Sequence, residues 1–149
     1  MHILGQTYKF KLQRLLDIRE QEEENRKIVF MEALRSKNEV EAELRDLEDN
    51  FEKYSTVNNN MSVTERKIQH HYLNLLNSTI GITKEKLKIH EEDVEVTRKE
   101  LVTAQVNKKI VGILKEKDKA AFIKEENRVE QIQNDEFALY GYLREGGRR

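Results

Sequence analysis

The stretch STVNNNMSVTE, residues 55–65, divides the chain into two long segments with helical periodicity. Its first part, residues 56–61, lacks both charge and helical periodicity, which predicts a turn. Ser62 and Glu65 have the spacing of a capping box, in which the Ser62 hydroxyl accepts from the Glu65 amide and the Glu65 carboxylate accepts from the Ser62 amide. One helix is therefore expected to end before this stretch, and a second is expected to begin at about residue 62.

The segment before the turn carries a seven-residue repeat, which is typical of a coiled-coil helix. The repeat predicts a helix over about residues 7–55, with Thr7 as its candidate cap. Its seam is apolar at both ends and polar in the middle. The predicted seam positions are Leu12, Leu16, Arg19, Glu23, Arg26, Phe30, Ala33, Lys37, Val40, Leu44, Leu47, Phe51 and Tyr54.

The segment after the turn predicts a longer helix, over about residues 62–143. Gly81 and Gly112 fall inside it, where each costs about 1 kcal/mol relative to alanine without ending the helix. Gly141 and the Gly146-Gly147 pair are expected to end it and to leave a flexible tail over residues 144–149. The predicted seam positions are Leu73, Leu76, Ile80, Thr83, Leu87, His90, Val94, Thr97, Leu101, Ala104, Lys108, Val111, Lys115, Asp118, Phe122, Glu125, Val129, Ile132, Glu136, Leu139 and Leu143.

The two helices are predicted to fold back on each other. If the chain reverses at the middle of the turn, Leu44 lies opposite Leu73 and Arg26 lies near Glu91. A parallel homodimer through the same seam is disfavoured because it would stack like charges from the polar middle of the seam. The expected fold class is all-α: a long two-helix antiparallel coiled-coil hairpin with the second helix longer than the first, in a single domain of residues 1–149.

The second helix is predicted to extend beyond the first by about 50 Å, at about 1.5 Å per residue. An apolar stripe on this extension has no other part of the chain to pack against, which predicts a partner. The extension begins at about Lys108, and its first part, residues 108–124, holds six lysines against Glu116 and Asp118. Three interpretations of this basic segment stay open: a solvated face, a surface for an acidic protein, and a site for nucleic acid or membrane.

The composition favours a long coiled coil over a globular domain. Of the 149 residues, 37% are charged, none is proline, and close to half are Ala, Glu, Lys, Leu or Arg. The mean hydropathy of −0.83 also fits disorder, but the regular repeat argues against that alternative. With 27 basic and 28 acidic residues interspersed, no overall field attracts nucleic acid or a membrane surface. The absence of cysteine, of a signal peptide and of a long apolar run predicts a cytoplasmic protein without membrane insertion.

No residue pattern indicates catalysis, a metal site or a cofactor site. His70 and His71 are adjacent, so on a helix they point about 100° apart and cannot chelate one metal together. No glycine-rich phosphate loop follows a strand, and the paired carboxylates along a rod face water. The protein is therefore predicted not to be an enzyme.

Both ends of the chain resemble one family. The opening FKLQRLLDIRE, residues 10–20, and the closing KEENRVEQ, residues 124–131, with DEFA at residues 135–138, resemble FliJ, the small flagellar type III export protein. The resemblance implies an antiparallel coiled coil similar to the central stalk (gamma) subunit of rotary ATP synthases. It also implies that the terminal end enters the pore of the hexameric export ATPase FliI and promotes its assembly and activity. The export gate protein FlhA and export chaperones are the other implied partners, with a peripheral location at the inner face of the cell membrane.

The resemblance also implies two sets of contact residues. The set that faces the ATPase ring would be Leu12, Leu15, Arg19, Glu126, Arg128, Gln131 and Asp135. The set that faces the export gate would be Leu47, Tyr54, Tyr72 and Leu76. Family members can carry a further aromatic residue one turn before the tyrosine at position 54, where this chain has Asn50.

Two alternative functions stay open. The first is a general export chaperone or escort that binds substrates or small chaperones without an ATPase. The second is a structural coiled-coil tether that forms homodimers through its seam. Mixing the protein with the ATPase separates these alternatives from the stalk, since only a stalk is expected to raise both hexamer formation and ATP turnover.

Overall fold

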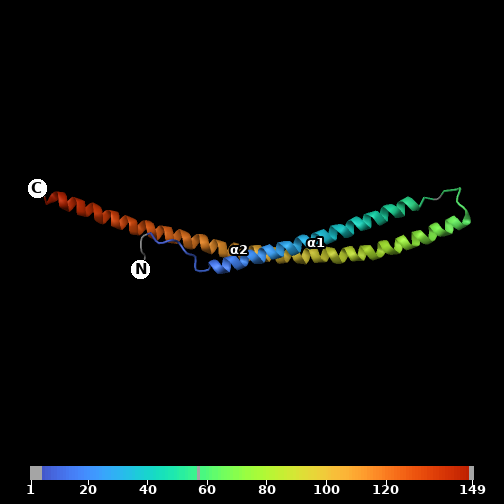
Figure 1. The fold of residues 1–149 in the computed structure, drawn as a ribbon, viewed down its shortest axis with the longest axis horizontal. Coiled ribbons are helices and arrows are strands. Elements are labelled where there is room, and N and C mark those ends of the chain that lie inside the picture. Colours follow the sequence, from blue (N-terminus) through green and yellow to red (C-terminus); the bar gives the residue numbers. More distant parts are fainter. Residues whose placement is uncertain (1–4, 57, 148–149) are drawn as a thin grey trace. The chain divides into compact units, whose positions relative to one another are not determined.

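The computed structural model describes residues 5–56 and 58–147 and contains two helices in this part of the chain (Figure 1). Helix α1 spans Gln13–Tyr54 and has 42 residues, whereas helix α2 spans Val63–Gly146 and has 84 residues. No strand is found among the residues described. The predicted fold class is confirmed: the protein is all-α, and its second helix is the longer one.

The capping box at the start of α2 is confirmed. The Glu65 amide donates to Ser62 Oγ at 3.2 Å, and the Ser62 amide donates to Glu65 Oε2 at 2.9 Å. These two bonds satisfy amides that have no acceptor within the first turn of the helix. The reciprocal pair therefore sets the start of α2, as the sequence predicts. Val57, inside the predicted turn, lies outside the described residues.

The predicted start of α1 was wrong, because the helix begins at Gln13 and not near Thr7. Residues 6–10 have no regular structure, and the first bond of the turn joins the Gln13 amide to the Phe10 carbonyl at 3.2 Å. The first turn of α1 contains no acidic residue that would interact favourably with the helix dipole. The residues around Thr7 are held instead by contacts with α2, which are described below.

Of the two predicted ends of α2, the one at Gly141 was wrong and the one at the Gly146-Gly147 pair is confirmed. The helix continues through Gly141 to Gly146, and the Gly147 amide donates to the Leu143 carbonyl at 3.1 Å. An interior glycine costs only about 1 kcal/mol relative to alanine, which is too little to end a long helix. Arg144 in the last turn complements the helix dipole. Of the predicted flexible tail, residues 144–146 are helical, and residues 148–149 lie outside the described part.

The chain divides into two compact units, which are described separately. The hairpin unit, residues 22–104, contains most of α1, the connection and the first part of α2. The terminal unit contains residues 5–21 and 105–147 of the described chain.

In the hairpin unit, α1 and α2 lie side by side and antiparallel (Figure 1). Three ion pairs between the helices show that they are antiparallel, because residues farther along α1 pair with residues that come earlier in α2. The pairs are Arg26 with Glu100 at 2.9 Å, Glu43 with Lys86 at 3.7 Å, and Glu48 with Lys84 at 3.8 Å. The predicted register was wrong, since Arg26 pairs with Glu100 and not near Glu91.

The connection between the helices explains the difference in register. The last residue of α1, Tyr54, contacts Tyr72 and not the first residues of α2. The Gln69 side-chain amide donates to the backbone carbonyls of Tyr54 and Thr56. The first turns of α2 therefore lie beyond Tyr54, the last residue of α1, and α2 then runs back alongside α1. A reversal at the middle of the turn would instead place the first residues of α2 beside Tyr54.

The seam of the hairpin unit follows the predicted heptad frames. Its buried residues are Ala33, Val40, Leu76, Ile80, Thr83, Val94, Thr97 and Ala104, and each is a predicted seam position. The two buried threonines satisfy their hydroxyls within α2: Thr83 Oγ1 donates to the Thr79 carbonyl at 2.8 Å, and Thr97 Oγ1 donates to the Asp93 carbonyl at 2.9 Å. The two threonines are therefore buried in the seam without unpaired hydroxyl groups.

In the terminal unit, the N-terminal segment and the first turns of α1 lie along α2. Leu16 and Val111 are buried, and Lys115 Nζ donates to Gln13 Oε1 at 2.7 Å. Beyond residue 130, every described residue of α2 is exposed. The predicted extension of the second helix beyond the first is thus present within this unit.

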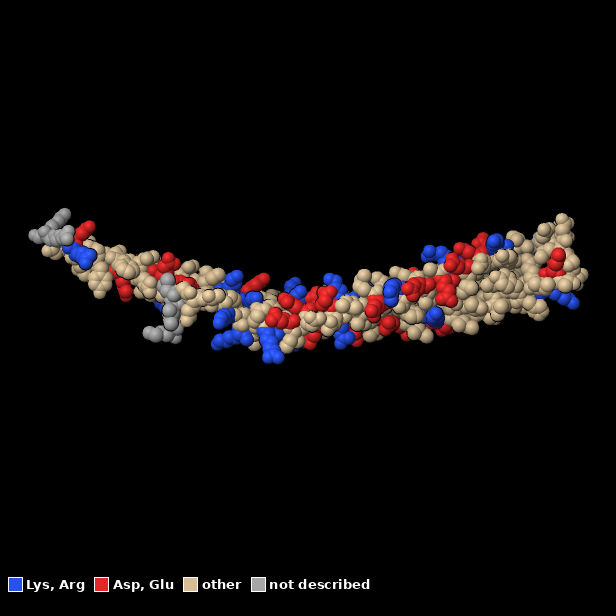
Figure 2. Space-filling view, in the orientation of Figure 1, with Lys and Arg blue, Asp and Glu red and all other residues tan. Residues whose placement is uncertain are grey.

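The surface of the protein carries mixed charge, as the composition predicts. On the face in Figure 2, acidic and basic side chains are interspersed. Neither helix, over the residues described, contains a run apolar enough to span a bilayer.

Candidate interaction surfaces

Two tyrosines form a pair at the end of the hairpin unit where the connection joins α1 and α2, which we name the closed end. The rings of Tyr54 and Tyr72 meet edge to face, with their centroids 5.3 Å apart and their planes at 88°. Lys53 Nζ lies 5.4 Å from the centroid of the Tyr54 ring. Both tyrosines remain exposed, so the pair presents aromatic surface to solvent. Such a pair on a fixed helical support is suited to anchoring a partner protein.

A groove adjoins the tyrosine pair, with a volume of about 340 Å³. Met61 and Ile68 line it together with the two tyrosines, and Glu65 and Gln69 complete the wall. Ile68 is exposed although it lies on the first turns of α2. The groove exists because α2 begins beyond the end of α1, which leaves this part of α2 without a helix beside it.

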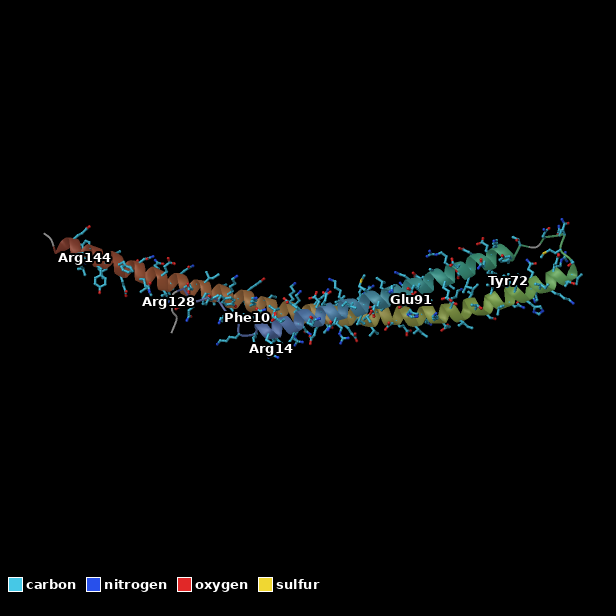
Figure 3. The ribbon with its side chains drawn as sticks, in the orientation of Figure 1. Phe10, Arg14, Tyr72, Glu91, Arg128 and Arg144 are labelled. Carbon is cyan, nitrogen blue, oxygen red and sulfur yellow. The ribbon has the colours of Figure 1, made fainter. Side chains whose placement is uncertain are left out.

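The predicted gate-facing residues divide into two kinds. Tyr54 and Tyr72 lie together on the surface, and Figure 3 labels Tyr72. Leu76 is only 6% exposed and packs in the seam, and Leu47 is half-buried. The two tyrosines are therefore accessible to solvent, whereas Leu76 is not and Leu47 is so only in part.

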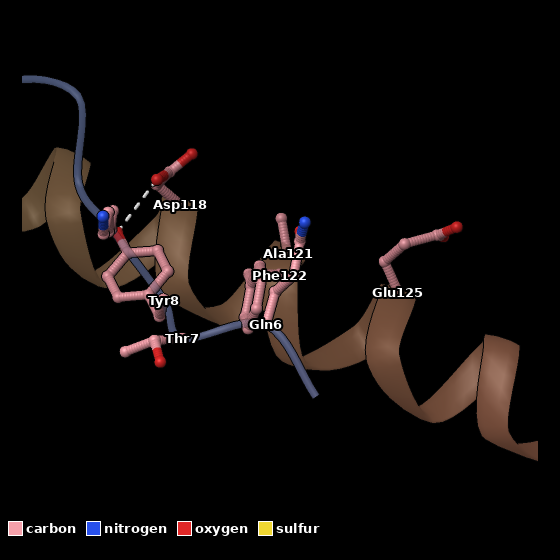
Figure 4. Close-up of a pocket in the computed structure, with 8 residues that line it drawn as sticks. Gln6, Thr7, Tyr8, Asp118, Ala121, Phe122 and Glu125 are labelled. Atoms are coloured by element: carbon pink, nitrogen blue, oxygen red, sulfur yellow. Dashed lines mark hydrogen bonds between the residues drawn. The ribbon is translucent and has the colours of Figure 1, made fainter. Parts of the chain in front are cut away.

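The N-terminal segment is attached to α2 by Tyr8 (Figure 4). The Tyr8 hydroxyl donates to Asp118 Oδ2 at 2.9 Å and lies 3.4 Å from the Lys115 carbonyl. The Tyr8 ring also packs on Phe122, with centroids 5.4 Å apart. Burial against α2, together with the hydrogen bond and the negative charge of Asp118, raises the pKa of the Tyr8 phenol. These contacts were not predicted, because Tyr8 precedes the heptad repeat.

The predicted ring-facing residues lie in two places within the terminal unit. Leu15 and Arg19 belong to the start of α1, which lies beside Lys115, and Leu12 directly precedes the helix. The others are Glu126, which is half-buried, and Arg128, Gln131 and Asp135, which are exposed. This second group begins about 16 Å farther along α2 at about 1.5 Å per residue. The structure does not bring the two groups into one patch.

Arg128, labelled in Figure 3, is paired with Glu125, three residues earlier on α2. Its Nε and Nη2 donate to the two carboxylate oxygens of Glu125, at 3.0 Å and 2.7 Å. The hydrogen bonds and the negative charge of Glu125 raise the pKa of Arg128. The fork is exposed, so it orients the guanidinium more than it stabilises the helix.

The last turns of α2, residues 131–147, form a segment that we name the C-terminal arm. It carries five large apolar residues that are each between 59% and 75% exposed: Phe137, Leu139, Tyr140, Tyr142 and Leu143. Because successive residues turn by about 100°, these side chains spread over more than half of the circumference of the helix. The heptad frame includes only Leu139 and Leu143, so the stripe predicted from the sequence understates this surface.

The described residues contain no group of three or more His, Cys, Asp or Glu side chains that could hold a metal ion. The rings of His70 and His71 have centroids 6.3 Å apart and diverge along the helix.

Comparison with known families decides the identity of the chain. The model of the family described as flagellar FliJ protein matches residues 8–147. The chain belongs to the FliJ family. Neither a curated protein nor a solved structure matches it. The FliJ match covers the tyrosine pair, the N-terminal contact and the whole C-terminal arm, and it makes the protein a component of flagellar export. The FliJ family is non-catalytic.

Proposed function

We propose that the protein is the coiled-coil stalk of the flagellar export ATPase complex. In this role the C-terminal arm enters the pore of the FliI hexamer and promotes its assembly and activity. The tyrosine pair contacts the export gate protein FlhA, and export chaperones bind the same protein. The chain acts as one coiled-coil domain over residues 1–149, without a cofactor and without catalysing a reaction.

The C-terminal arm is the observation that carries this proposal. A helix with one narrow apolar stripe packs against one surface, whereas apolar residues spread over more than half of the circumference call for protein on several sides. Phe137, Tyr140 and Tyr142 are exposed in different directions. The pore of a ring provides walls on every side of a single helix, so it suits the arm better than a flat surface does.

The two sets of predicted ring-facing residues take different roles in this proposal. Arg128, Gln131 and Asp135 lie on the part of α2 that has no α1 beside it, so they can face the wall of a pore. Leu15 and Arg19 lie where α1 and α2 are paired, which makes a thicker rod, and Leu12 directly precedes this region. We assign the first group to the interior of the ring and the second to its rim.

The location follows from the partners. An ATPase ring that serves an export gate works at the inner face of the cell membrane, so the protein is placed in the cytoplasm and reaches the membrane only through the export apparatus. The tyrosine pair is the surface that supports gate contact, because it is aromatic, exposed and held by two helices.

The proposal is tested by adding the full chain to the purified FliI ATPase and measuring hexamer formation and ATP turnover together. A stalk raises both. An escort binds export chaperones but changes neither quantity, and that result would overturn the proposal.

A further inference from the structure

A second apolar stripe runs along α2 in the hairpin unit, outside the seam. We name it the outer stripe. Its residues are each between 54% and 71% exposed and follow one another every seven positions: Ile68, Leu75, Ile82, Ile89 and Val96. Exposed apolar residues are common singly on protein surfaces, but a regular row of five is not.

The spacing of the outer stripe identifies the shape of its partner. A straight α-helix drifts by about 20° per heptad relative to a seven-residue repeat, so such a repeat follows the supercoil of a coiled coil. The seam residues Leu76, Ile80 and Thr83 place α2 in that supercoil with α1. A row with the same period stays on one side of α2 along its length. Its natural partner is another helix that lies along α2.

The borders of the outer stripe differ between its two halves. The residues beside Ile68 and Leu75 are mostly uncharged: Thr64, Glu65, His71, Tyr72, Ser78 and Thr79. The residues beside Ile89 and Val96 are all charged: Glu85, Lys86, Glu92, Asp93, Lys99 and Glu100. Lys86 and Glu100 already pair with residues of α1. The charge that remains at this second border is mainly negative.

This asymmetry favours one relative direction of two copies. When two copies lie antiparallel with a two-fold axis at Ile82, Leu75 faces Ile89 of the second copy. The carboxylates of Glu92 and Asp93 then face the uncharged half of the other stripe, near His71. A parallel pair would place Glu92 and Asp93 beside their own copies, which repels.

We propose that the outer stripe is a self-association surface, on which a second copy of the chain packs antiparallel about Ile82. The contact leaves the seam of each hairpin closed. It extends over about 42 Å at about 1.5 Å per residue, with one apolar residue per heptad in place of the two of a full coiled-coil seam. The dimer is therefore reversible and dissociates on dilution. The stripe shares no residue with the C-terminal arm.

The first test is sedimentation of the full chain over a range of concentrations. The protein is expected to pass from monomer to dimer as its concentration rises. Ile82→Glu should raise the dissociation constant at least about tenfold, because it brings two carboxylates together on the two-fold axis. The matched control is Val102→Glu, on another exposed apolar residue of α2 outside the stripe, which should leave the dimer unchanged. Circular dichroism of both variants checks that the helices remain.

The second test uses disulfide formation, because the chain has no cysteine of its own. Ile82→Cys should link to itself in the antiparallel pair, and Leu75→Cys should link to Ile89→Cys when the two variants are mixed. Ile89→Cys alone should link poorly, since its counterpart is then Leu75.

Three results would overturn the proposal. A chain that stays monomeric at every concentration has no such dimer. Equal loss of dimer in Ile82→Glu and Val102→Glu means that the stripe is not the contact. Strong self-linking of Ile89→Cys means that the copies are parallel. Each of these outcomes leaves the ATPase measurement unaffected, so failure here is distinct from failure of the stalk function.

Discussion

The Tyr8 hydroxyl donates to Asp118 Oδ2 at 2.9 Å, across more than a hundred residues of sequence. This bond and the packing of Tyr8 on Phe122 attach the N-terminal segment to α2 within the terminal unit. The segment thereby covers a part of α2 that lies beyond the N-terminal end of α1. It extends the covered part of α2 although it is not itself helical.

Removing the Tyr8 hydroxyl should release the N-terminal segment. In Tyr8→Phe the ring can still pack on Phe122, but the bond to Asp118 is lost, so residues 6–12 should exchange their amide hydrogens severalfold faster. Hydrogen exchange measured by mass spectrometry checks this expectation. Asp118→Asn is the matched control, because its amide oxygen still accepts from Tyr8 and should give a smaller effect. Unchanged exchange in Tyr8→Phe would show that packing alone holds the segment.

The same contact should be sensitive to high pH. The pKa of Tyr8 is raised above its ordinary value of 10.0 by burial and by Asp118, so the protonated phenol is favoured in the folded protein. Its contribution is fully present below the ordinary pKa and is lost as the pH rises through the raised pKa. An ultraviolet titration of tyrosinate, taken as the difference between the wild type and Tyr8→Phe, isolates this group. Asp118→Asn should lower the pKa of Tyr8 towards its ordinary value, and no change would mean that burial acts alone.

A charge in the seam should unfold the hairpin unit. Val94 is 5% exposed between the two helices, so Val94→Asp buries a carboxylate without a partner and should lower the free energy of unfolding by about 3 kcal/mol or more. Val102 on the same helix is 51% exposed, and Val102→Asp should change it by less than about 0.5 kcal/mol. Urea unfolding followed by circular dichroism compares the two. Equal stabilities would contradict the assigned seam.

The C-terminal arm should control stimulation of the ATPase. Phe137→Ala with Tyr140→Ala removes apolar surface from two sides of the arm and should raise the concentration needed for half-maximal stimulation at least about tenfold. Arg128→Ala with Asp135→Ala should impair stimulation as well. Both variants should keep their helical circular dichroism, since these side chains are exposed. Full stimulation by the Phe137 and Tyr140 variant would exclude the arm as the ring contact.

The tyrosine pair should act separately from the arm. Tyr54→Ala with Tyr72→Ala removes the exposed edge-to-face contact, so binding to the purified cytoplasmic part of FlhA should fall at least about tenfold. Stimulation of the ATPase by this variant should be unchanged. Loss of both activities together would indicate unfolding of the closed end, which the circular dichroism of the variant would reveal.

Local patterns in the sequence were sufficient for much of the fold. The capping box of Ser62 and Glu65 and the heptad frames of the hairpin unit depend on residues close together along the chain, and both are confirmed. The register depends on the path of the connection, where Gln69 binds the end of α1, and no short pattern contains that information. The attachment of Tyr8 depends likewise on a single distant partner.

The candidate surfaces were predictable to different degrees. Tyr54 and Tyr72 were singled out from the sequence, but their edge-to-face contact required the true register. The apolar residues of the C-terminal arm were partly overlooked because Phe137, Tyr140 and Tyr142 do not follow the heptad. The pattern that could have revealed them is the presence of several large apolar residues within residues 137–143. A helix that packs on one side only normally carries polar residues on its other sides.

The seven-residue repeat of the hairpin seam has a consequence for slippage. A displacement of one helix by one heptad would again place seam residues against seam residues, and the exposed ion pairs beside them contribute at most about 1 kcal/mol each. The closed end is what forbids such a slip, because Gln69 fixes the carbonyls of Tyr54 and Thr56 beside the first turns of α2. The length of the connection therefore determines which turn of α1 meets which turn of α2. A change in that length would shift every contact between the two helices of the hairpin unit.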